Sequence, residues 1–165
     1  MDFTKLLQDK AEIYKDKPAV IFRGTPVSFA QLKDVSFKAA GALSSLGVGK
    51  SDKVAIFLPN IPEYMFGFLG TFILRAVAVP LDFMLTEEEL ISFINHSESK
   101  ILLAQEKKGI DLAAIKNKCP SLKHIVILGE ATQKDYITWA ALLKETRPVP
   151  QINADESDCS SIFYT

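Results

Sequence analysis

Hydrophobic residues along this chain of 165 residues follow two spacings, one typical of helices and one typical of buried strands. Recurrence every three to four residues predicts helices over residues 3–14, 28–46, 60–74, 86–95, 112–118 and about 136–143. Short apolar runs predict strands over residues 19–22, 54–58, 76–81, 100–104, 124–128 and 160–165, with a hairpin turn at 23–26. Helices and strands alternate, which predicts an α/β fold whose mainly parallel sheet is flanked by helices.

Three helix starts carry capping signals. Ser28 with Gln31 and Thr86 with Glu89 have capping-box spacing, in which a side-chain oxygen accepts from one free backbone N–H and a second side chain reaches back. Asn60 with Glu63 repeats this logic. Gly47 is the expected stop of the helix that begins at Ser28, because glycine adopts the left-handed conformation that ends helices.

The predicted helix over residues 60–74 is apolar on nearly every side, which predicts burial on several sides. Residues 65–85 could be mistaken for a membrane span, but Arg75 lies at the centre of this stretch and Pro80 interrupts it. A central Arg costs roughly 2.5–3.5 kcal/mol on membrane insertion. A buried helix followed by a buried strand is therefore the better interpretation, and we expect no membrane span.

Composition favours an ordinary globular protein, since 48% of the residues are hydrophobic and 24% are charged. The net charge of −1 and the absence of any Lys/Arg cluster argue against nucleic-acid binding. Cys119 and Cys159 are too few for a disulfide framework and fit a reducing compartment. No signal peptide precedes the first helix, so we expect a cytoplasmic protein.

No motif on its own predicts a catalytic residue or a metal site. The run Gly49-Lys50-Ser51 imitates the end of a phosphate-binding loop, but a predicted helix precedes it and a strand follows, which inverts the required geometry. His96 and His124 have no partner at metal-ligand spacing. The three acids of residues 87–89 are explained by the positive end of the helix dipole, and nothing marks Cys119 as a nucleophile.

Several blocks follow one another in a fixed order along the chain. They are Lys17-Pro18-Ala19-Val20 with residues 27–32, Leu46-Gly47-Val48 with residues 52–56, Leu58-Pro59-Asn60 with Pro62-Glu63, residues 74–81, residues 86–90, and Ile162-Phe163-Tyr164-Thr165. In order and spacing they resemble the adenylate-forming (AMP-binding) superfamily, which includes the acyl-CoA synthetases. Ala76, where the family usually has Gly, and Phe83, where Pro is common, depart from the pattern.

The resemblance implies that residues 1–165 are a partial N-terminal, AMP-binding domain without a complete second domain. It implies a fatty acid–CoA ligase that uses Mg-ATP to convert a carboxylate into an acyl-adenylate and then transfers the acyl group to CoA. Thr165 would be the first, nucleotide-binding residue of the family's phosphate-binding loop. The remaining catalytic parts would lie beyond Thr165, so we expect the isolated chain to be inactive and to hold no cofactor tightly.

Two further expectations remain open at the level of sequence. The chain could instead be a free-standing α/β binding or interaction module without enzymatic activity. The apolar helix over residues 60–74 would expose hydrophobic surface in an isolated chain, which predicts a homodimer formed through that surface.

Overall fold

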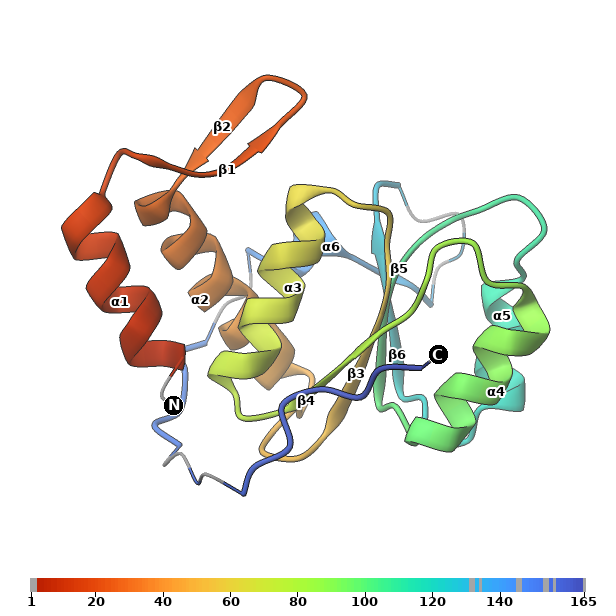
Figure 1. Cartoon of the computed structure of the whole chain (residues 1–165). Helices are drawn as coiled ribbons and strands as arrows, with labels where there is room; N and C mark the ends of the chain where they lie inside the picture. The colour runs from red at the N-terminus through yellow and green to blue at the C-terminus, as the bar shows by residue number, and fades with distance from the viewer. Residues whose placement is uncertain are drawn as a thin grey trace.

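The structure, a computed structural model, describes residues 3–130, 133, 135–144, 147–152, 155 and 157–164. Its centre is a five-stranded parallel sheet in the order β4-β3-β5-β6-β7, and a separate antiparallel pair joins β1 to β2. Figure 1 shows the main sheet between two layers of helices, with α1, α2 and α3 on one side and α4 and α5 on the other. The predicted α/β class with a parallel sheet and flanking helices is confirmed.

The predicted elements agree closely with those observed. The helices are α1 (Phe3–Tyr14), α2 (Phe29–Ser45), α3 (Pro62–Ile73), α4 (Glu87–Ser97), α5 (Leu112–Lys118) and α6 (Trp139–Leu142). The strands are β1 (Pro18–Phe22), β2 (Thr25–Ser28), β3 (Lys53–Phe57), β4 (Val77–Pro80), β5 (Ile101–Gln105), β6 (His124–Leu128) and β7 (Ile137–Thr138). The helix predicted over about 136–143 is shorter, since residues 137 and 138 form β7, which is too short for a recognisable apolar pattern. The predicted turn over 23–26 is also shorter, because β2 begins at Thr25.

Alternate residues of each central strand point to opposite faces of the sheet and enter two separate hydrophobic clusters. In β3, Val54 and Ile56 join the cluster on the side of α2 and α3, whereas Ala55 and Phe57 join the cluster on the side of α4 and α5. The strands are apolar on both faces because helices cover both.

The β1–β2 hairpin lies apart from the main sheet, beside the end of α1 and the start of α2 (Figure 1). Its turn consists of Arg23 and Gly24, which both have positive φ angles, of 48° and 81°. Two successive positive φ values are typical of the tight two-residue turn whose twist matches that of antiparallel strands.

The capping boxes at Ser28 and Thr86 are confirmed, since both reciprocal hydrogen bonds are present in each. The third predicted box is wrong. Ile61, not Asn60, is the N-cap of α3, and no side chain caps this end. Pro62 occupies the start of the helix, where its missing N–H leaves one donor fewer to satisfy and its fixed φ already suits a helix.

Two predictions of burial were too strong. Residues 160–164 do not form a buried strand, since they contribute one parallel bridge, between Ser161 and Ala78, and Phe163 is 67% exposed. α3 is buried mainly in its second half, and Met65 near its start is 39% exposed. Thr165 lies outside the described residues. Within the described ranges, no helix is long and apolar enough to cross a membrane.

Candidate functional site

The order of the strands identifies one edge of the sheet as the place to look for a ligand site. From β3 the chain crosses to β4 on one side, and it then returns to β5 on the other side of β3. The connections that leave β3 and β5 therefore run in opposite directions. In open α/β sheets, ligands bind in the crevice beyond the carboxyl ends of strands at such a switch point.

A cation and two aromatic rings meet at this switch point. Phe57 ends β3, Phe83 follows β4, and Lys107 follows β5. The Lys107 ammonium donates to the Phe83 carbonyl oxygen at 2.6 Å and lies 5.3 Å from the ring centroid of Phe83 and 5.9 Å from that of Phe57. The two ring centroids are 4.9 Å apart. Hydrogen bonding and cation–π attraction thus tie the end of β3 to the loops after β4 and β5.

A cavity of about 500 Å³ lies on the β4 side of this cluster. It is lined by the loop after β3 (Leu58, Pro59, Asn60), by Tyr64 of α3, and by residues 80–84 after β4. Burial raises the pKa of the Tyr64 phenol. Asp82 Oδ1 accepts from the Met84 N–H at 2.8 Å, which fixes the shape of the loop after β4. Polar and apolar groups share the walls of this cavity, which suits a ligand with both polar and apolar parts.

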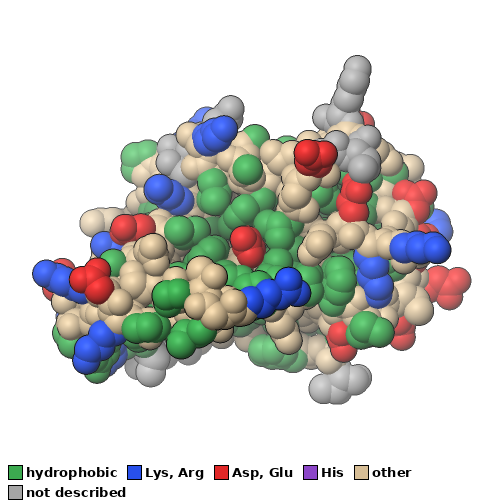
Figure 2. Space-filling model, turned by 90° about the horizontal axis from the view of Figure 1, so that it is seen from above, with side chains coloured by type: hydrophobic (Ala, Val, Ile, Leu, Met, Phe, Trp, Pro, Cys, Tyr) green, Lys and Arg blue, Asp and Glu red, His purple; other side chains and the backbone are tan. Residues whose placement is uncertain are grey.

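A second cavity of about 500 Å³ lies on the β6 side, and Lys107 borders this one. Its other walls are largely charged or polar, and they include Glu106, Lys108, Asp111 and Tyr136. The pKa of the Tyr136 phenol is raised, first by burial and then by the nearby carboxylates of Asp111, Glu106 and Asp135. Figure 2 looks onto the carboxyl edge and shows hydrophobic side chains gathered near its middle, with charged ones among and around them.

A larger groove of about 820 Å³ runs between α1 and α2, away from the strand ends. Its walls mix three basic side chains with three acidic ones, Lys5, Lys33, Lys38, Asp9, Glu12 and Asp34. The mixture gives the groove no net charge that would select an anion or a cation. Size alone therefore does not make it the functional site.

The last described residues run alongside β4, in the direction of the carboxyl edge of the sheet. The Ala78 N–H donates to the Ser160 carbonyl and the Ile162 N–H donates to the Ala78 carbonyl, both at 2.9 Å. Residues 160–162 thus run parallel to β4 and lead the chain toward the carboxyl edge. Thr165, the predicted nucleotide-binding residue, is outside the described part, but its predecessor Tyr164 packs on α4.

The loop that imitates a phosphate-binding motif is confirmed as a helix stop followed by a strand. Gly47 has a φ of 81° after α2, and β3 begins at Lys53. Asp52 Oδ2 accepts from the Gly49 N–H at 2.8 Å and from the Lys100 ammonium at 2.9 Å. A carboxylate of the chain itself therefore occupies the Gly49 N–H, one of the donors that a phosphate would need.

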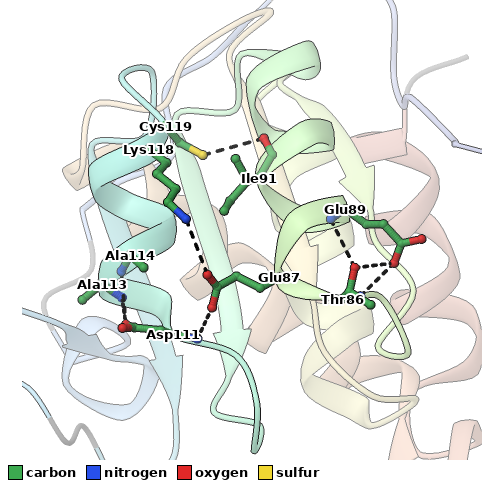
Figure 3. A network of polar contacts seen from close by, with 9 residues as sticks. All are labelled: Thr86, Glu87, Glu89, Ile91, Asp111, Ala113, Ala114, Lys118 and Cys119. Carbon is green, nitrogen blue, oxygen red and sulfur yellow. Dashed lines mark hydrogen bonds and ion pairs between the residues drawn. The ribbon is translucent and has the colours of Figure 1, made fainter.

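The acids of residues 87–89 lie in the first turn of α4, as the dipole argument predicts. Figure 3 shows how two of them are used: Glu89 completes the capping box with Thr86, and Glu87 accepts from the Asp111 N–H at 2.8 Å and faces Lys118 at 3.9 Å. Hydrogen bonds to Thr86 lower the pKa of Glu89. These acids hold the start of α4 and lie beside α5.

The remaining candidates of the sequence do not converge on one site. Cys119 is buried and donates to the Ile91 carbonyl at 3.8 Å (Figure 3), and burial raises the pKa of its thiol, which opposes a nucleophilic role. His124 lies in β6, where burial and then Lys116 and Lys100 lower its pKa. Among the residues that the structure describes, no three His, Cys, Asp or Glu side chains are placed to hold a metal ion.

Sequence reasoning missed Lys107 and gave Phe83 no role beyond a departure from the family pattern. A signal was present, since both residues fall just after predicted strands whose carboxyl ends meet at one edge. What the sequence lacks is the order of the strands, and that order decides which loops become neighbours.

Comparisons with known proteins agree on one family. The family model described as AMP-binding enzyme matches residues 7–165. The chain is 31% identical to a crotonobetaine/carnitine–CoA ligase of Salmonella paratyphi A, over 79% of this chain and 26% of that protein. It is 27% identical to 4-hydroxybutyrate–CoA ligase 2 of Metallosphaera sedula, over 96% of this chain and 31% of that protein. The chain thus spans a third or less of the length of these relatives.

Solved structures share the fold. The long-chain-fatty-acid–CoA ligase of Archaeoglobus fulgidus superposes with a TM-score of 0.87 at 20% identity, over 100% of this chain and 34% of that one. Coronafacic acid ligase of Pectobacterium brasiliense superposes with a TM-score of 0.86 at 22% identity, over 99% of this chain and 33% of that one.

Proposed function

The chain belongs to the AMP-binding enzyme family, and on that premise we propose that residues 1–165 form the first part of the large N-terminal domain of an acyl-CoA ligase. In the proposed reaction, a carboxylate attacks the α-phosphorus of ATP, and an acyl-adenylate and pyrophosphate form. The thiol of CoA then attacks the acyl carbon and AMP leaves. A fatty acid is the proposed carboxylate, and the cytoplasm is the proposed location.

The observation that carries this proposal is the family match over residues 7–165, combined with relatives that are CoA ligases. The fold adds a physical reason. Residues 160–162 lie parallel to β4 and run toward the edge where α/β enzymes bind ligands. Thr165 would then begin the nucleotide-binding loop.

The described residues have a limited part in this reaction. The cavity bordered by Asn60, Tyr64 and Phe83 would bind and shield a partly apolar portion of a substrate. Lys107 would fasten the loops that form its wall. The described residues offer no cluster of carboxylates for Mg²⁺, so we assign none of them to the metal. The isolated chain would be a scaffold and would not turn over.

The test begins with the gene, read downstream of Thr165. The protein encoded with its natural continuation is assayed for ATP–pyrophosphate exchange with a panel of carboxylic and fatty acids, and for thioester formation with CoA. The 165-residue chain is assayed in parallel. We expect acid-dependent exchange and thioester formation by the longer protein and none by the isolated chain.

Each other outcome rejects a defined part of the proposal. Exchange without thioester formation would keep adenylation and reject CoA ligation. Turnover by the isolated chain would contradict its role as a scaffold. A stop codon directly after Thr165, with no exchange, would favour a free-standing binding module. The proposed homodimer is tested separately, by sedimentation of the isolated chain at increasing concentration.

A further inference from the structure

The segment that ends at Tyr164 is attached to the rest of the molecule at three separate places. At its start, the Asp158 carboxylate pairs with the Lys50 ammonium at 2.7 Å. In the middle, both hydrogen bonds to Ala78 fasten it to the edge of β4. At its end, Tyr164 contacts α4. The first two attachments set the path of the segment along the sheet, and the third acts where the chain leaves it.

Tyr164 contacts α4 through both its ring and its hydroxyl. Its ring is stacked on that of Phe93, with centroids 4.3 Å apart and planes inclined by 16°. The ring of His96 approaches edge-on at 5.6 Å. The hydroxyl lies 2.9 Å from His96 Nδ1 and 3.3 Å from the Phe93 carbonyl oxygen.

The number of hydrogens on each group limits which of Tyr164, His96 and the Phe93 carbonyl can donate a hydrogen bond. A hydroxyl has one hydrogen, and the Phe93 carbonyl can only accept, so the Tyr164 hydroxyl donates to that carbonyl. Its contact with His96 is then a hydrogen bond only if Nδ1 carries a hydrogen and donates to the hydroxyl oxygen. In the tautomer that carries a hydrogen on Nδ1, the donors run from His96 through Tyr164 to the Phe93 carbonyl.

The residues before and after Phe163 show which side of the segment is attached. Ile162 and Tyr164 point to the face of α4, where both pack against the second hydrophobic cluster. Phe163, between them, points the other way and is 67% exposed. A purely hydrophobic attachment would not need the hydroxyl or His96. The two hydrogen bonds add direction, because they fix where the end of the tyrosine ring lies.

We infer that Tyr164 and His96 are positioning residues that set the direction in which the chain leaves the sheet toward its nucleotide-binding loop. This inference rests on the proposed function. Neither the Tyr164 nor the His96 side chain is proposed to contact the substrate. They act through the backbone of the segment, by holding its last described residue on the end of α4.

The first experiment uses the isolated chain and does not depend on enzymatic activity. Amide hydrogen exchange at Ile162 reports whether the segment stays on β4. We expect Tyr164→Phe, which keeps the stacked ring, to speed exchange at Ile162 about fivefold, the effect of losing about one hydrogen bond. Tyr14→Phe, on α1, is the matched control and should leave this rate unchanged. Unchanged exchange in Tyr164→Phe would overturn the attachment.

The second experiment uses the protein with its natural continuation. We expect Tyr164→Phe and His96→Leu each to raise the KM for ATP about fivefold, with the KM for the acid within about twofold of the original. His96→Asn, whose amide N–H can replace Nδ1–H, should restore the KM for ATP. Equal changes in both KM values, or failure of the asparagine to rescue, would show a merely structural role.

The two experiments separate the two proposals. If the longer protein has no ATP-dependent activity with any acid, the proposed function fails and the positioning of a nucleotide loop fails with it. The exchange result would then still decide whether Tyr164 holds the segment. If activity is present but the KM for ATP is unchanged in Tyr164→Phe, the inference alone is overturned.

Discussion

The two faces of the central sheet are covered by helices that meet in different ways. On one face, α2 and α3 approach so closely that a Cβ placed on Gly70 would lie 2.9 Å from Ala39 Cβ and 3.0 Å from Ala40 N. On the other face, polar bonds join the ends of α4 and α5, as Figure 3 shows for Glu87 with Asp111 and Lys118.

This difference indicates on which face of the sheet the fold tolerates amino-acid substitutions. Close contact of backbones leaves no room for an added atom, so the α2–α3 face depends on shape. Exposed polar bonds near helix ends contribute little each and can be re-formed after small shifts. Substitutions on the first face should therefore cost more stability than substitutions of the polar contacts on the second.

The largest effect is expected for Leu43→Ala, because Leu43 on α2 is fully buried in the first cluster. Losing this side chain should lower the free energy of unfolding by about 2–5 kcal/mol, from lost burial and from the cavity left behind. Urea unfolding measures the change. Ile13→Ala on α1, where the side chain is 65% exposed, is the control and should change stability by less than about 0.5 kcal/mol. A loss below about 1 kcal/mol for Leu43→Ala would contradict a tightly packed face.

Gly70→Ala tests the contact between α2 and α3 directly. Alanine favours a helix over glycine by about 1 kcal/mol, but the added methyl group would meet the backbone of α2. Overpacking of this kind should cost a net amount of about 1–3 kcal/mol in the free energy of unfolding. Gly67→Ala is the matched comparison, since its methyl group would meet only a side-chain methyl of Leu103, at 2.7 Å, which can rotate. A larger loss for Gly67→Ala would reverse this interpretation.

Local patterns were enough to predict most of the fold. The bounds of α1, α5 and β6 were predicted as they are observed, because each has a clear apolar period and a clear stop. The predictions that failed depend on neighbours in space. The run over residues 160–165 predicts a buried strand, yet its described residues form a single bridge beside β4 and leave Phe163 exposed.

The location of the candidate site could be predicted from the sequence, but the residues that form it could not. The sequence indicates a parallel sheet, and parallel sheets place ligands at their carboxyl edge. It does not indicate that the chain returns across β3, and this return is what brings Lys107 to Phe57 and Phe83. Contacts between loops that follow different strands are set by strand order, on which local periodicity carries no information.

The N-caps of α2 and α4, which lie on opposite faces of the sheet, allow a second comparison with smaller expected changes in stability. Ser28→Ala at α2 and Thr86→Ala at α4 each remove the acceptor of a complete capping box. Each should lower the free energy of unfolding by about 1 kcal/mol, because a backbone donor loses its partner. Asn60→Ala should cost less than about 0.5 kcal/mol, since α3 has no side-chain cap. Urea unfolding of the three variants is the measurement, and an equal loss for Asn60→Ala would mean that Asn60 caps α3 after all.

The smallest expected effect concerns pH. The two boxes differ at their third position, which is Gln31 in α2 and Glu89 in α4. The hydrogen bonds from Thr86 hold the pKa of Glu89 below its ordinary value of 4.5. A lowered folded-state pKa means that this stabilisation is complete above the unfolded-state pKa and is lost as the pH falls through the folded-state pKa.

Only the Glu89 box should therefore weaken in acid. Urea midpoints measured at falling pH should decline slightly less in Glu89→Gln than in the unaltered chain, because glutamine keeps the acceptor and does not titrate. Glu88→Gln, in the same turn of α4, is the matched control for removal of one negative charge. Glu89 is fully exposed, so salt should reduce the difference. An identical decline in Glu89→Gln and in the unaltered chain would show that the carboxylate of this box adds nothing beyond what the amide in α2 supplies.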